Sequence, residues 1–233
     1  MNSREPSAIS GKRYIVLIGD LLSSRGVIDR IGVQARLHDA MEQCNTQHRC
    51  LVSPYTITLG DEFQAVLSCA DFVFTDAITI LLALYPTRIR FSIGVGILTT
   101  PINNNQAIGM DGPAFHLARD GITKLKKSGG LFAVTGLPVE YQPLVQHTLD
   151  LISHEVKTRW NYRYLRTYLG LNAKLLNDKS SYGKGVVRHT AAELQITESG
   201  VYRLIEVGAI RVIRSLFGDI SETLNHAVGE SGE

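Results

Sequence analysis

The chain has 233 residues, of which 44% are hydrophobic and 20% are charged, and its formal net charge is only +2. These values are typical of an ordinary globular protein and exclude a disordered or fibrous chain. The net charge is too small to indicate nucleic-acid binding by itself. The length fits either one large domain or two modest ones.

Nothing in the sequence predicts secretion or membrane insertion. Residues 1–11 lack the apolar core of a signal peptide and are expected to form a loose tail. The longest apolar run, residues 77–85, is far shorter than the roughly 20 residues of a membrane-spanning helix. Three cysteines are odd in number and have no metal-binding spacing, so we expect no disulfide framework. The sequence predicts a cytoplasmic protein.

The first part of the chain predicts alternating strands and helices. Continuous apolar runs and two-residue alternation indicate strands, and a 3.6-residue period indicates helices. We expect strands at residues 13–22, 55–59, 63–68, 88–98 and 131–136, and helices at residues 28–45, 70–85 and 112–127. Asp29 is a plausible cap for the first helix. Gly94 and Gly96 mark a strand that another segment can approach closely.

The expected order β-α-β-β-α-β-α-β predicts the fold class. A strand pair flanked by crossover helices is typical of a ferredoxin-like split βαβ sheet, here with one extra αβ unit. We therefore expect an α/β (α+β) palm-like domain at residues 12–141.

From residue 142 onward the pattern is almost entirely helical. Residues 144–171 carry apolar side chains at spacings of three and four, which predicts one long helix. Residues 177–185 are rich in turn-forming residues and predict a linker. We expect a helical domain at residues 142–225 and a loose tail at residues 226–233.

A helix-turn-helix pattern lies at about residues 188–215. Small or apolar residues occupy the positions that pack two such helices together: Ala191, Leu194, Ile196, Val201 and Leu204. Thr190 and Thr197 can cap the first and the second helix. Gln195 stands at the turn position where Gly is usual, and a positive φ there costs roughly 1 kcal/mol.

The second helix of this pattern carries candidate DNA contacts. These are Glu198, Ser199, Tyr202 and Arg203, with Arg211 and Arg214 further along for phosphates. Lys and Arg outnumber Asp and Glu in this half of the chain, which is the local charge that DNA binding requires. The alternative is a helical bundle used for dimerisation. Trp160 is interpreted as a core residue rather than a stacking platform for bases.

Carboxylates stand at the ends of two predicted strands. Asp20 ends the first strand, and Asp61 and Glu62 lie in the following hairpin. In a split βαβ sheet these strands are neighbours, so we expect the three side chains at one edge. There they could hold Mg²⁺ or Mn²⁺, whose coordination shell substrate phosphates usually complete. The alternative is that each carboxylate is an ordinary turn or cap residue.

A candidate phosphate-binding segment follows Asp20 directly. Ser23, Ser24 and Arg25 supply N–H groups, hydroxyls and a guanidinium that suit a triphosphate. A solvated loop is the alternative.

Four separated stretches together resemble the SatD family of bacterial proteins. They are LIGDLLSSR, ITLGDEFQAVL, RFSIGVGI and AIGMDGPAFHLARDG, in this order. The resemblance covers most of the chain and implies no particular biochemical activity.

The same stretches more distantly resemble the palm domains of class III nucleotidyl cyclases and GGDEF diguanylate cyclases. This resemblance implies that Asp20 and Asp61 are metal ligands and that Glu62 matches the Glu of the GGDEF string. It also implies that Arg119 is a catalytic residue that steadies the leaving group, and that the protein forms a head-to-tail homodimer.

Two positions depart from the pattern of those enzymes. Phe115 stands where the class III enzymes carry an Asn, and Leu59 replaces the first Gly of the GGDEF string. Both departures favour binding over turnover.

Three functions are compatible with the sequence. The first is a regulator whose palm domain binds a nucleotide, a divalent metal or both, and is coupled to a DNA-binding helix-turn-helix. The second is an active metal-dependent nucleotidyl cyclase or nucleotidyltransferase. The third is a non-catalytic association protein in which the carboxylates are turn residues.

Overall fold

The computed structural model describes residues 11–22, 29–47, 49–173 and 184–229. The strands are β1 (Arg13–Leu21), β2 (Leu51–Leu59), β3 (Glu62–Leu67), β4 (Ile89–Ile97) and β5 (Phe132–Thr135). The helices are α1 (Arg30–Gln47), α2 (Val73–Leu84), α3 (Pro113–Ser128), α4 (Gln142–Thr158), α5 (Tyr162–Ala173), α6 (Lys184–Leu194), α7 (Glu198–Val207) and α8 (Ile210–Gly229). The expected order of elements up to β5 is confirmed.

The five strands form one sheet in the order β2-β3-β1-β4-β5. β1 is antiparallel to both of its neighbours, β3 and β4, whereas β5 runs parallel to β4. This is the topology of a ferredoxin-like split βαβ sheet, to which α3 and β5 add one further unit. The expected α+β fold class is confirmed.

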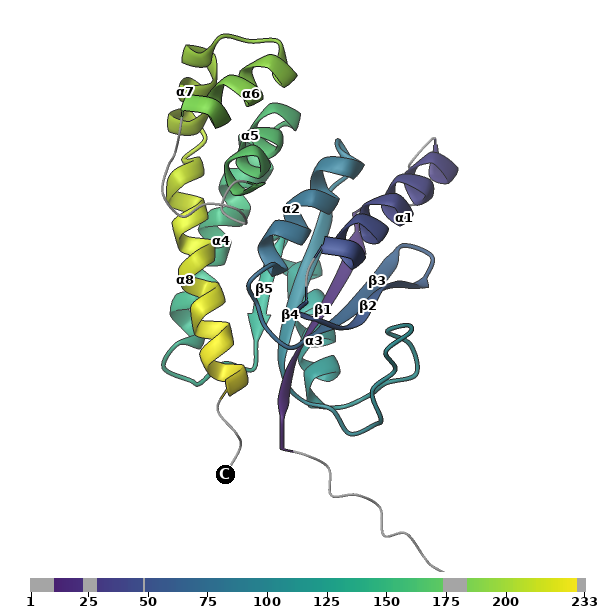
Figure 1. The fold of residues 1–233 in the computed structure, drawn as a ribbon. Coiled ribbons are helices and arrows are strands. Elements are labelled where there is room, and N and C mark those ends of the chain that lie inside the picture. Colours follow the sequence, from purple (N-terminus) through teal and green to yellow (C-terminus); the bar gives the residue numbers. More distant parts are fainter. Residues whose placement is uncertain (1–10, 23–28, 48, 174–183, 230–233) are drawn as a thin grey trace, which may run out of the picture.

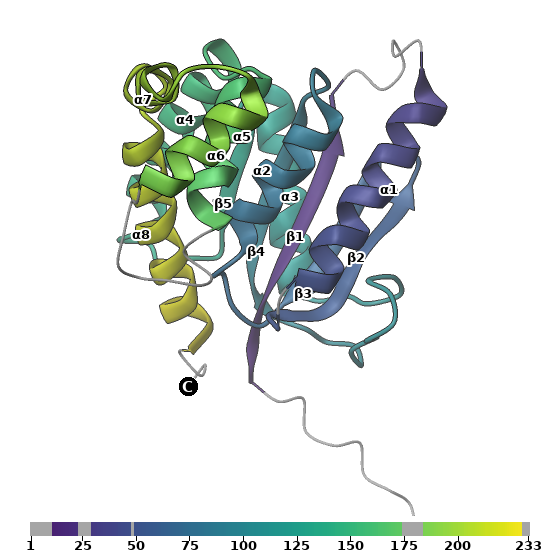
Figure 2. The ribbon, with the colours of Figure 1, turned by 45° about the horizontal axis from the view of Figure 1, so that its top comes forward.

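The sheet separates two hydrophobic clusters. α1 and α2 cover one face of the sheet, and α3 covers the other (Figures 1 and 2). Because side chains alternate along a strand, Ile15 and Leu17 of β1 join the larger cluster, while Val16 and Ile18 join the smaller one under α3. Asp20 continues the second series, so its side chain lies on the α3 side.

α3 approaches β4 unusually closely, as the glycines of this strand predicted. A Cβ atom at Gly94 would lie 2.2 Å from the carbonyl oxygen of Ala114, and one at Gly96 would lie 3.0 Å from the nitrogen of the same residue. On the helix side, a Cβ atom at Gly121 would lie 2.0 Å from Oγ of Ser92. The missing side chains therefore determine how near α3 can come to the sheet.

The C-terminal helices extend the core of the sheet. α4 packs beside β5, α5 packs on α2, and α8 contacts β1 and β4 (Figures 1 and 2). Phe217 of α8 stacks on Phe74 of α2, with ring centroids 4.2 Å apart. One cluster of buried side chains runs from Ile15 to Ala227. The hydrophobic core thus continues across residue 141, where the sequence analysis places a domain boundary.

Two predictions in the helical half are corrected. The single long helix predicted at residues 144–171 is two helices, α4 and α5. Asn161 starts the second one, because its Oδ1 accepts a hydrogen bond from the N–H of Arg163 at 2.9 Å. Trp160, between the two helices, is only 1% exposed, as a core residue should be. α8 continues to Gly229, so the predicted tail does not begin at residue 226.

The cysteines also differ from expectation. Cys50 and Cys69 form a disulfide, whereas Cys44 is free and buried. The pairing follows from the β2–β3 hairpin, whose register places Leu51 opposite Leu67. In the part of the chain that is described, no helix has the length and apolar character to cross a membrane. The cytoplasmic location stays a prediction.

Candidate functional site

Three charged residues form a row across the sheet near the end of β1. Asp20 is the cross-strand partner of Glu62 on β3 and of Arg90 on β4. Directly paired residues project from the same face, so all three lie on the α3 side. The hairpin turn brings Asp61 to this edge, where its carbonyl accepts a hydrogen bond from the N–H of Leu21 at 3.1 Å. We call Glu62, Asp20 and Arg90 the charged row.

Asp20 is held by two cations. Its carboxylate lies 3.0 Å from Nη1 of Arg90 and 2.9 Å from Nζ of Lys126, which is on the last turn of α3. The side chains of Asp20 and Arg90 are 10% and 17% exposed, whereas that of Lys126 is half exposed. Nε of Arg90 is buried and has no hydrogen-bond partner among the described residues. The accessible ammonium of Lys126 beside the guanidinium of Arg90 is suited to an anionic group.

The surroundings of Glu62 raise the pKa of its carboxyl above the ordinary value. Burial is the largest cause, followed by the negative charge of Asp20, and Asp61 adds a smaller effect in the same direction. Lys126 and Arg119 act in the opposite direction. All four of these charged side chains are therefore close enough to Glu62 to act on its carboxyl. A bound cation would relieve the repulsion among the three carboxylates.

The three carboxylates of this edge are not arranged as a chelate. Among the described residues, three or more donor atoms within 4.8 Å of one another occur only at Cys50, Cys69 and Asp71. The first two are joined in a disulfide and offer no thiolate. An ion shared at the edge therefore requires side-chain movement, and Asp20 would have to exchange a cationic partner for it.

The other predicted site residues lie at several places in the structure. Arg119 of α3 acts on Glu62, so it belongs to the edge, and its guanidinium lies 5.9 Å from the ring centre of Phe115. Phe115 is fully buried in the cluster under α3, so it offers no polar group there. The predicted phosphate-binding residues lie outside the described part of the chain: Ser23, Ser24 and Arg25.

Arg90 and Lys126 belong to the site, although the sequence did not identify them. Arg90 is the one charged residue within the β4 sequence IRFSIGVGI, and a charge in a buried strand is a usable signal. Lys126 follows Arg119 by seven residues, which places both on the same face of α3. Because other lysines stand next to it in the sequence, Lys126 could not be singled out as a site residue.

α6 and α7 form the predicted helix-turn-helix (Figures 1 and 2). Gln195 in the turn has a φ of 52°, as expected. Thr197 caps α7, because its side chain accepts a hydrogen bond from the N–H of Gly200 at 3.1 Å. The predicted cap at Thr190 is wrong, since α6 begins at Lys184 and Thr190 is buried inside the helix.

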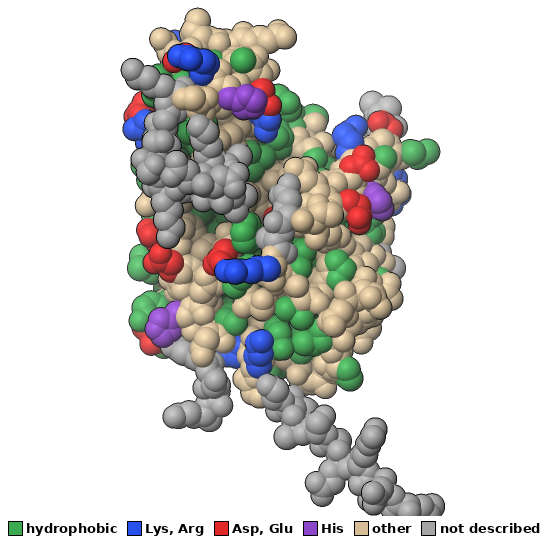
Figure 3. All heavy atoms as spheres, viewed as in Figure 1, with side chains coloured by type: hydrophobic (Ala, Val, Ile, Leu, Met, Phe, Trp, Pro, Cys, Tyr) green, Lys and Arg blue, Asp and Glu red, His purple; other side chains and the backbone are tan. Residues whose placement is uncertain are grey.

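The predicted DNA contacts are on the surface of this unit. Four of them are exposed: Ser199, Tyr202, Arg203 and Arg211. Acidic side chains lie near the cations, with Arg211 Nη1 3.7 Å from Glu206 and Arg188 Nε 3.3 Å from Glu198. On the face shown in Figure 3, both signs of charge are mixed around α6 and α7 and neither forms a continuous patch.

A series of hydrogen bonds connects the end of β1, next to the charged row, to the helix-turn-helix. The N–H of Leu22, two residues after Asp20, donates to the carbonyl of Arg88 at 2.8 Å. Nη2 of Arg88 donates to the carbonyl of Trp160 at 3.0 Å. The indole Nε1 of Trp160 donates to the carbonyl of Gly208, just after α7, at 2.9 Å. The end of β1 and the second helix of the motif are thus joined through two buried or partly buried side chains.

Comparison with known proteins identifies a family. No curated protein matches this chain. Among solved structures, the catalytic core of a rhodopsin-guanylyl cyclase with converted specificity, in complex with ATPαS, is similar with 17% identity and a TM-score of 0.34, over 48% of this chain and 72% of that one. The profile of the SatD family matches residues 14–213. Because this match covers most of the sequence, the chain belongs to the SatD family.

Proposed function

We propose that this protein is a regulator whose palm-like sheet binds a nucleoside triphosphate together with Mg²⁺ or Mn²⁺, and that this binding is coupled to a DNA-binding helix-turn-helix. The observation that carries the proposal is the charged row beneath the last turn of α3. It combines carboxylates that suit a hard cation with basic groups that suit phosphate, at one edge of the sheet.

Each residue of the edge has a distinct role in this proposal. Asp20, Asp61 and Glu62 would hold the cation, which would offset phosphate charge when bound. Arg90 and Lys126 would pair with phosphate oxygens. Residues 23–25, which follow β1, remain candidates for the rest of the phosphate chain.

The ion pairs of Asp20 predict cooperative binding. Because two cations already neutralise this carboxylate, a divalent metal alone would have to displace one of them and should bind weakly. A triphosphate offers Arg90 and Lys126 another partner, which would make Asp20 available to the metal. Metal and nucleotide should therefore each increase the affinity for the other.

We propose binding rather than turnover. Phe115 offers an aromatic ring where the class III cyclases carry an Asn, and this ring is buried in the core. Arg119 is close enough to lower the pKa of Glu62 and would contribute to phosphate binding.

Thermal unfolding with ATP, GTP, CTP or UTP, each with and without Mn²⁺, tests the site. A nucleotide at one hundred times its Kd should add about 2.7 kcal/mol to the free energy of unfolding. That corresponds to a rise in Tm of roughly 5–11 °C for a chain of this size. We expect the rise only when nucleotide and Mn²⁺ are both present, and we expect Asp20→Asn to abolish it. The control is Asp219→Asn, at an exposed carboxylate on α8, which should keep the full rise.

Two results would overturn the proposal. If no combination of nucleotide and metal raises Tm, the palm-like sheet has no nucleotide site of this kind. If Asp20→Asn keeps the full rise, the ligand is held elsewhere. A rise with Mn²⁺ alone would contradict the cooperative binding inferred from the ion pairs of Asp20.

The DNA-binding part of the proposal needs its own measurement. Fluorescence anisotropy with a labelled duplex at low salt should detect binding that weakens in Arg203→Ala and Arg211→Ala. Arg36→Ala, on the exposed side of α1, is the matched control and should bind as the wild type does. Coupling predicts that nucleotide with Mn²⁺ changes the DNA affinity of the wild type and leaves that of Asp20→Asn unchanged. Light scattering tests the homodimer that the palm resemblance implies.

A further inference from the structure

A cleft of about 970 Å³ lies between α2, α5 and α8. Its walls are formed by residues of these helices and of the segment just before α2, and Gln43 of α1 also lines it. The charged row lies on the opposite face of the sheet, under α3. The cleft is therefore a separate site, and the function proposed above makes no use of it.

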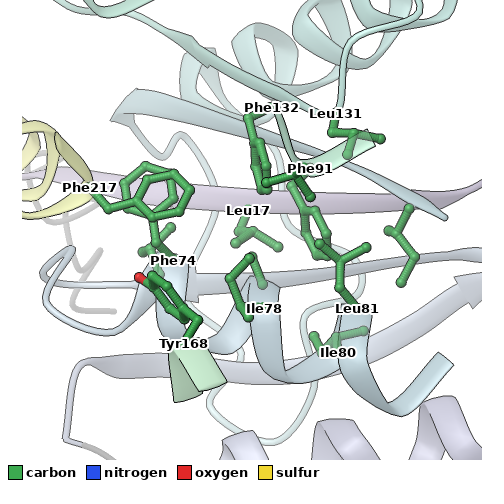
Figure 4. Close-up of a cluster of buried hydrophobic side chains, with 14 of the residues drawn as sticks. Leu17, Phe74, Ile78, Ile80, Leu81, Phe91, Leu131, Phe132, Tyr168 and Phe217 are labelled. Atoms are coloured by element: carbon green, nitrogen blue, oxygen red, sulfur yellow. The ribbon is translucent and has the colours of Figure 1, made fainter. Parts of the chain in front are cut away.

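The floor of the cleft is aromatic. Phe74 of α2 and Phe217 of α8 stack with ring centroids 4.2 Å apart, and Tyr168 of α5 meets Phe217 edge to face at 6.1 Å (Figure 4). Phe72 and Leu82 also line the cleft and are only half-buried. Incompletely covered apolar side chains next to a ring stack offer a surface for a flat ring.

Basic and hydroxyl groups lie along one part of the wall. Arg166 of α5 and Arg214 of α8 both line the cleft. Tyr168 is 2% exposed, its hydroxyl forms a hydrogen bond with Asn172, and the charge of Arg214 acts on it. Burial raises the pKa of Tyr168 to about 12, so the hydroxyl keeps its proton at neutral pH. The two guanidiniums that line the cleft, together with the protonated hydroxyl near Arg214, supply donors for an anionic group such as phosphate.

The other part of the wall is acidic. Asp71 and Glu222 line the cleft there, together with Asn225. Asn225 is fixed in place, because it accepts a hydrogen bond from the N–H of Ala70 at 2.6 Å and donates one to Asp71 at 2.7 Å. Glu222 follows Arg214 by eight residues on α8, which separates them by about 12 Å along the helix axis. Carboxylate oxygens accept hydrogen bonds and suit amino or hydroxyl groups of a ligand.

We propose that this cleft binds a nucleoside monophosphate without a metal ion. A ligand that matches the walls has an anionic group at one end, a flat ring in the middle and hydrogen-bond donors at the other end. In this arrangement the phosphate pairs with Arg166 and Arg214, and the base lies against the aromatic floor with its donors towards Asp71 and Glu222. The two guanidiniums supply the positive charge, so no divalent cation is required.

The cleft is also connected to the helix-turn-helix. Arg166 forms an ion pair with Glu193 of α6, and both side chains are about one-third exposed. A phosphate in the cleft competes with Glu193 for the same guanidinium. Occupation of the cleft therefore changes a contact that holds the first helix of the motif on α5.

Isothermal titration calorimetry in a buffer that contains EDTA tests the proposal, because chelation removes the metal that the palm-like edge needs. The probes are AMP, GMP, CMP and UMP, with adenosine and inorganic phosphate titrated separately. We expect at least one mononucleotide to bind at least about tenfold more tightly than adenosine or phosphate, because each of these lacks one of the two anchoring parts.

Four variants locate the binding. Arg214→Gln should weaken it about tenfold or more, whereas Arg211→Gln, which removes the same charge from α8 outside the cleft, should leave it unchanged. Ala83→Trp, which fills the cleft from α2, should abolish it. Asp20→Asn should bind as the wild type does. Circular dichroism confirms that each variant is folded.

Three results would overturn the proposal. One is that no mononucleotide binds the wild-type protein at millimolar concentration. Another is that Arg211→Gln weakens binding as much as Arg214→Gln, or that Ala83→Trp leaves it unchanged. The third is that Asp20→Asn abolishes binding while Ala83→Trp does not, which would place the ligand at the palm-like edge and not in the cleft.

Discussion

Replacement of Gly94 by Ala tests whether the close contact between β4 and α3 positions the basic side chains over the charged row. The new Cβ atom would lie 2.2 Å from the carbonyl oxygen of Ala114 and 2.6 Å from the nitrogen of Ala118. Carbon–oxygen contacts are normally about 3.3 Å or longer, so α3 would have to move by about 1 Å. Both opposing atoms belong to the backbone, so no side-chain rotation relieves the clash.

The expected loss of stability is large for a single methyl group. Overpacking of a tight core contact costs about 1–3 kcal/mol, and a clash with backbone atoms corresponds to the upper end of that range. For a chain of this size, about 3 kcal/mol lowers Tm by roughly 6–12 °C. The displacement of α3 should also weaken the nucleotide- and Mn²⁺-dependent rise in Tm, because α3 carries Lys126.

Calorimetric or circular-dichroism unfolding measures this effect, and Gly218→Ala is the matched control. Gly218 lies inside α8, where a Cβ atom meets nothing within 4 Å. The same substitution should therefore raise stability there, by up to about 1 kcal/mol, since Gly is unfavourable inside a helix. If Gly94→Ala unfolds at the wild-type Tm, or if the two Ala variants lose the same stability, the contact between β4 and α3 is not as tight as the distances imply.

Asp20→Asn should lower the free energy of unfolding by about 3 kcal/mol, since it leaves the mostly buried Arg90 without its charged partner. Urea denaturation measures this loss. An unchanged midpoint would mean that the ion pair does not stabilise the fold. Glu62→Gln should be more stable than the wild type at neutral pH. Because the pKa of Glu62 is raised in the folded wild type, the wild type loses stability as the pH rises through the range just above the ordinary Glu pKa. Below the ordinary Glu pKa, the wild type and Glu62→Gln should be equally stable. A difference that persists in acid would contradict this cause. Thr197→Ala should lower stability by about 1 kcal/mol through loss of the cap to Gly200, and the exposed Thr123→Ala, which caps nothing, should show no comparable loss in the same unfolding assay.

The sheet domain could be predicted from sequence because its signals are local. Each strand shows a continuous apolar run or an alternating pattern, and Gly60 with Asp61 marks the hairpin turn within a few residues. Gly94 and Gly96 indicate that another segment approaches this strand closely, although they do not identify the segment. Residues 195–197 likewise predicted a turn with positive φ followed by a capped helix, and both features are present.

The predictions of one long helix and of no disulfide were wrong because the local sequence pattern did not contain the deciding contact. The apolar spacing at residues 144–171 continues through the break between α4 and α5, so periodicity predicted a single helix. Asn161 caps the second helix there, but this depends on Trp160 turning into the core. The pairing of Cys50 with Cys69 needed the register of the hairpin, which the number of cysteines does not contain.

In the candidate site too, some features follow from the sequence and others depend on the tertiary structure. The sequence by itself determined the order of elements, the position of Asp20, Asp61 and Glu62 at strand ends, and the helix-turn-helix, because periodicity and turn chemistry act between residues close in the chain. Only the tertiary structure decided that Asp20 pairs with Arg90, 70 residues away, and with Lys126 on α3. It alone also assembled the cleft between α2, α5 and α8. Such contacts depend on strand register and helix docking, which are set by the packing of the whole core and not by any one segment.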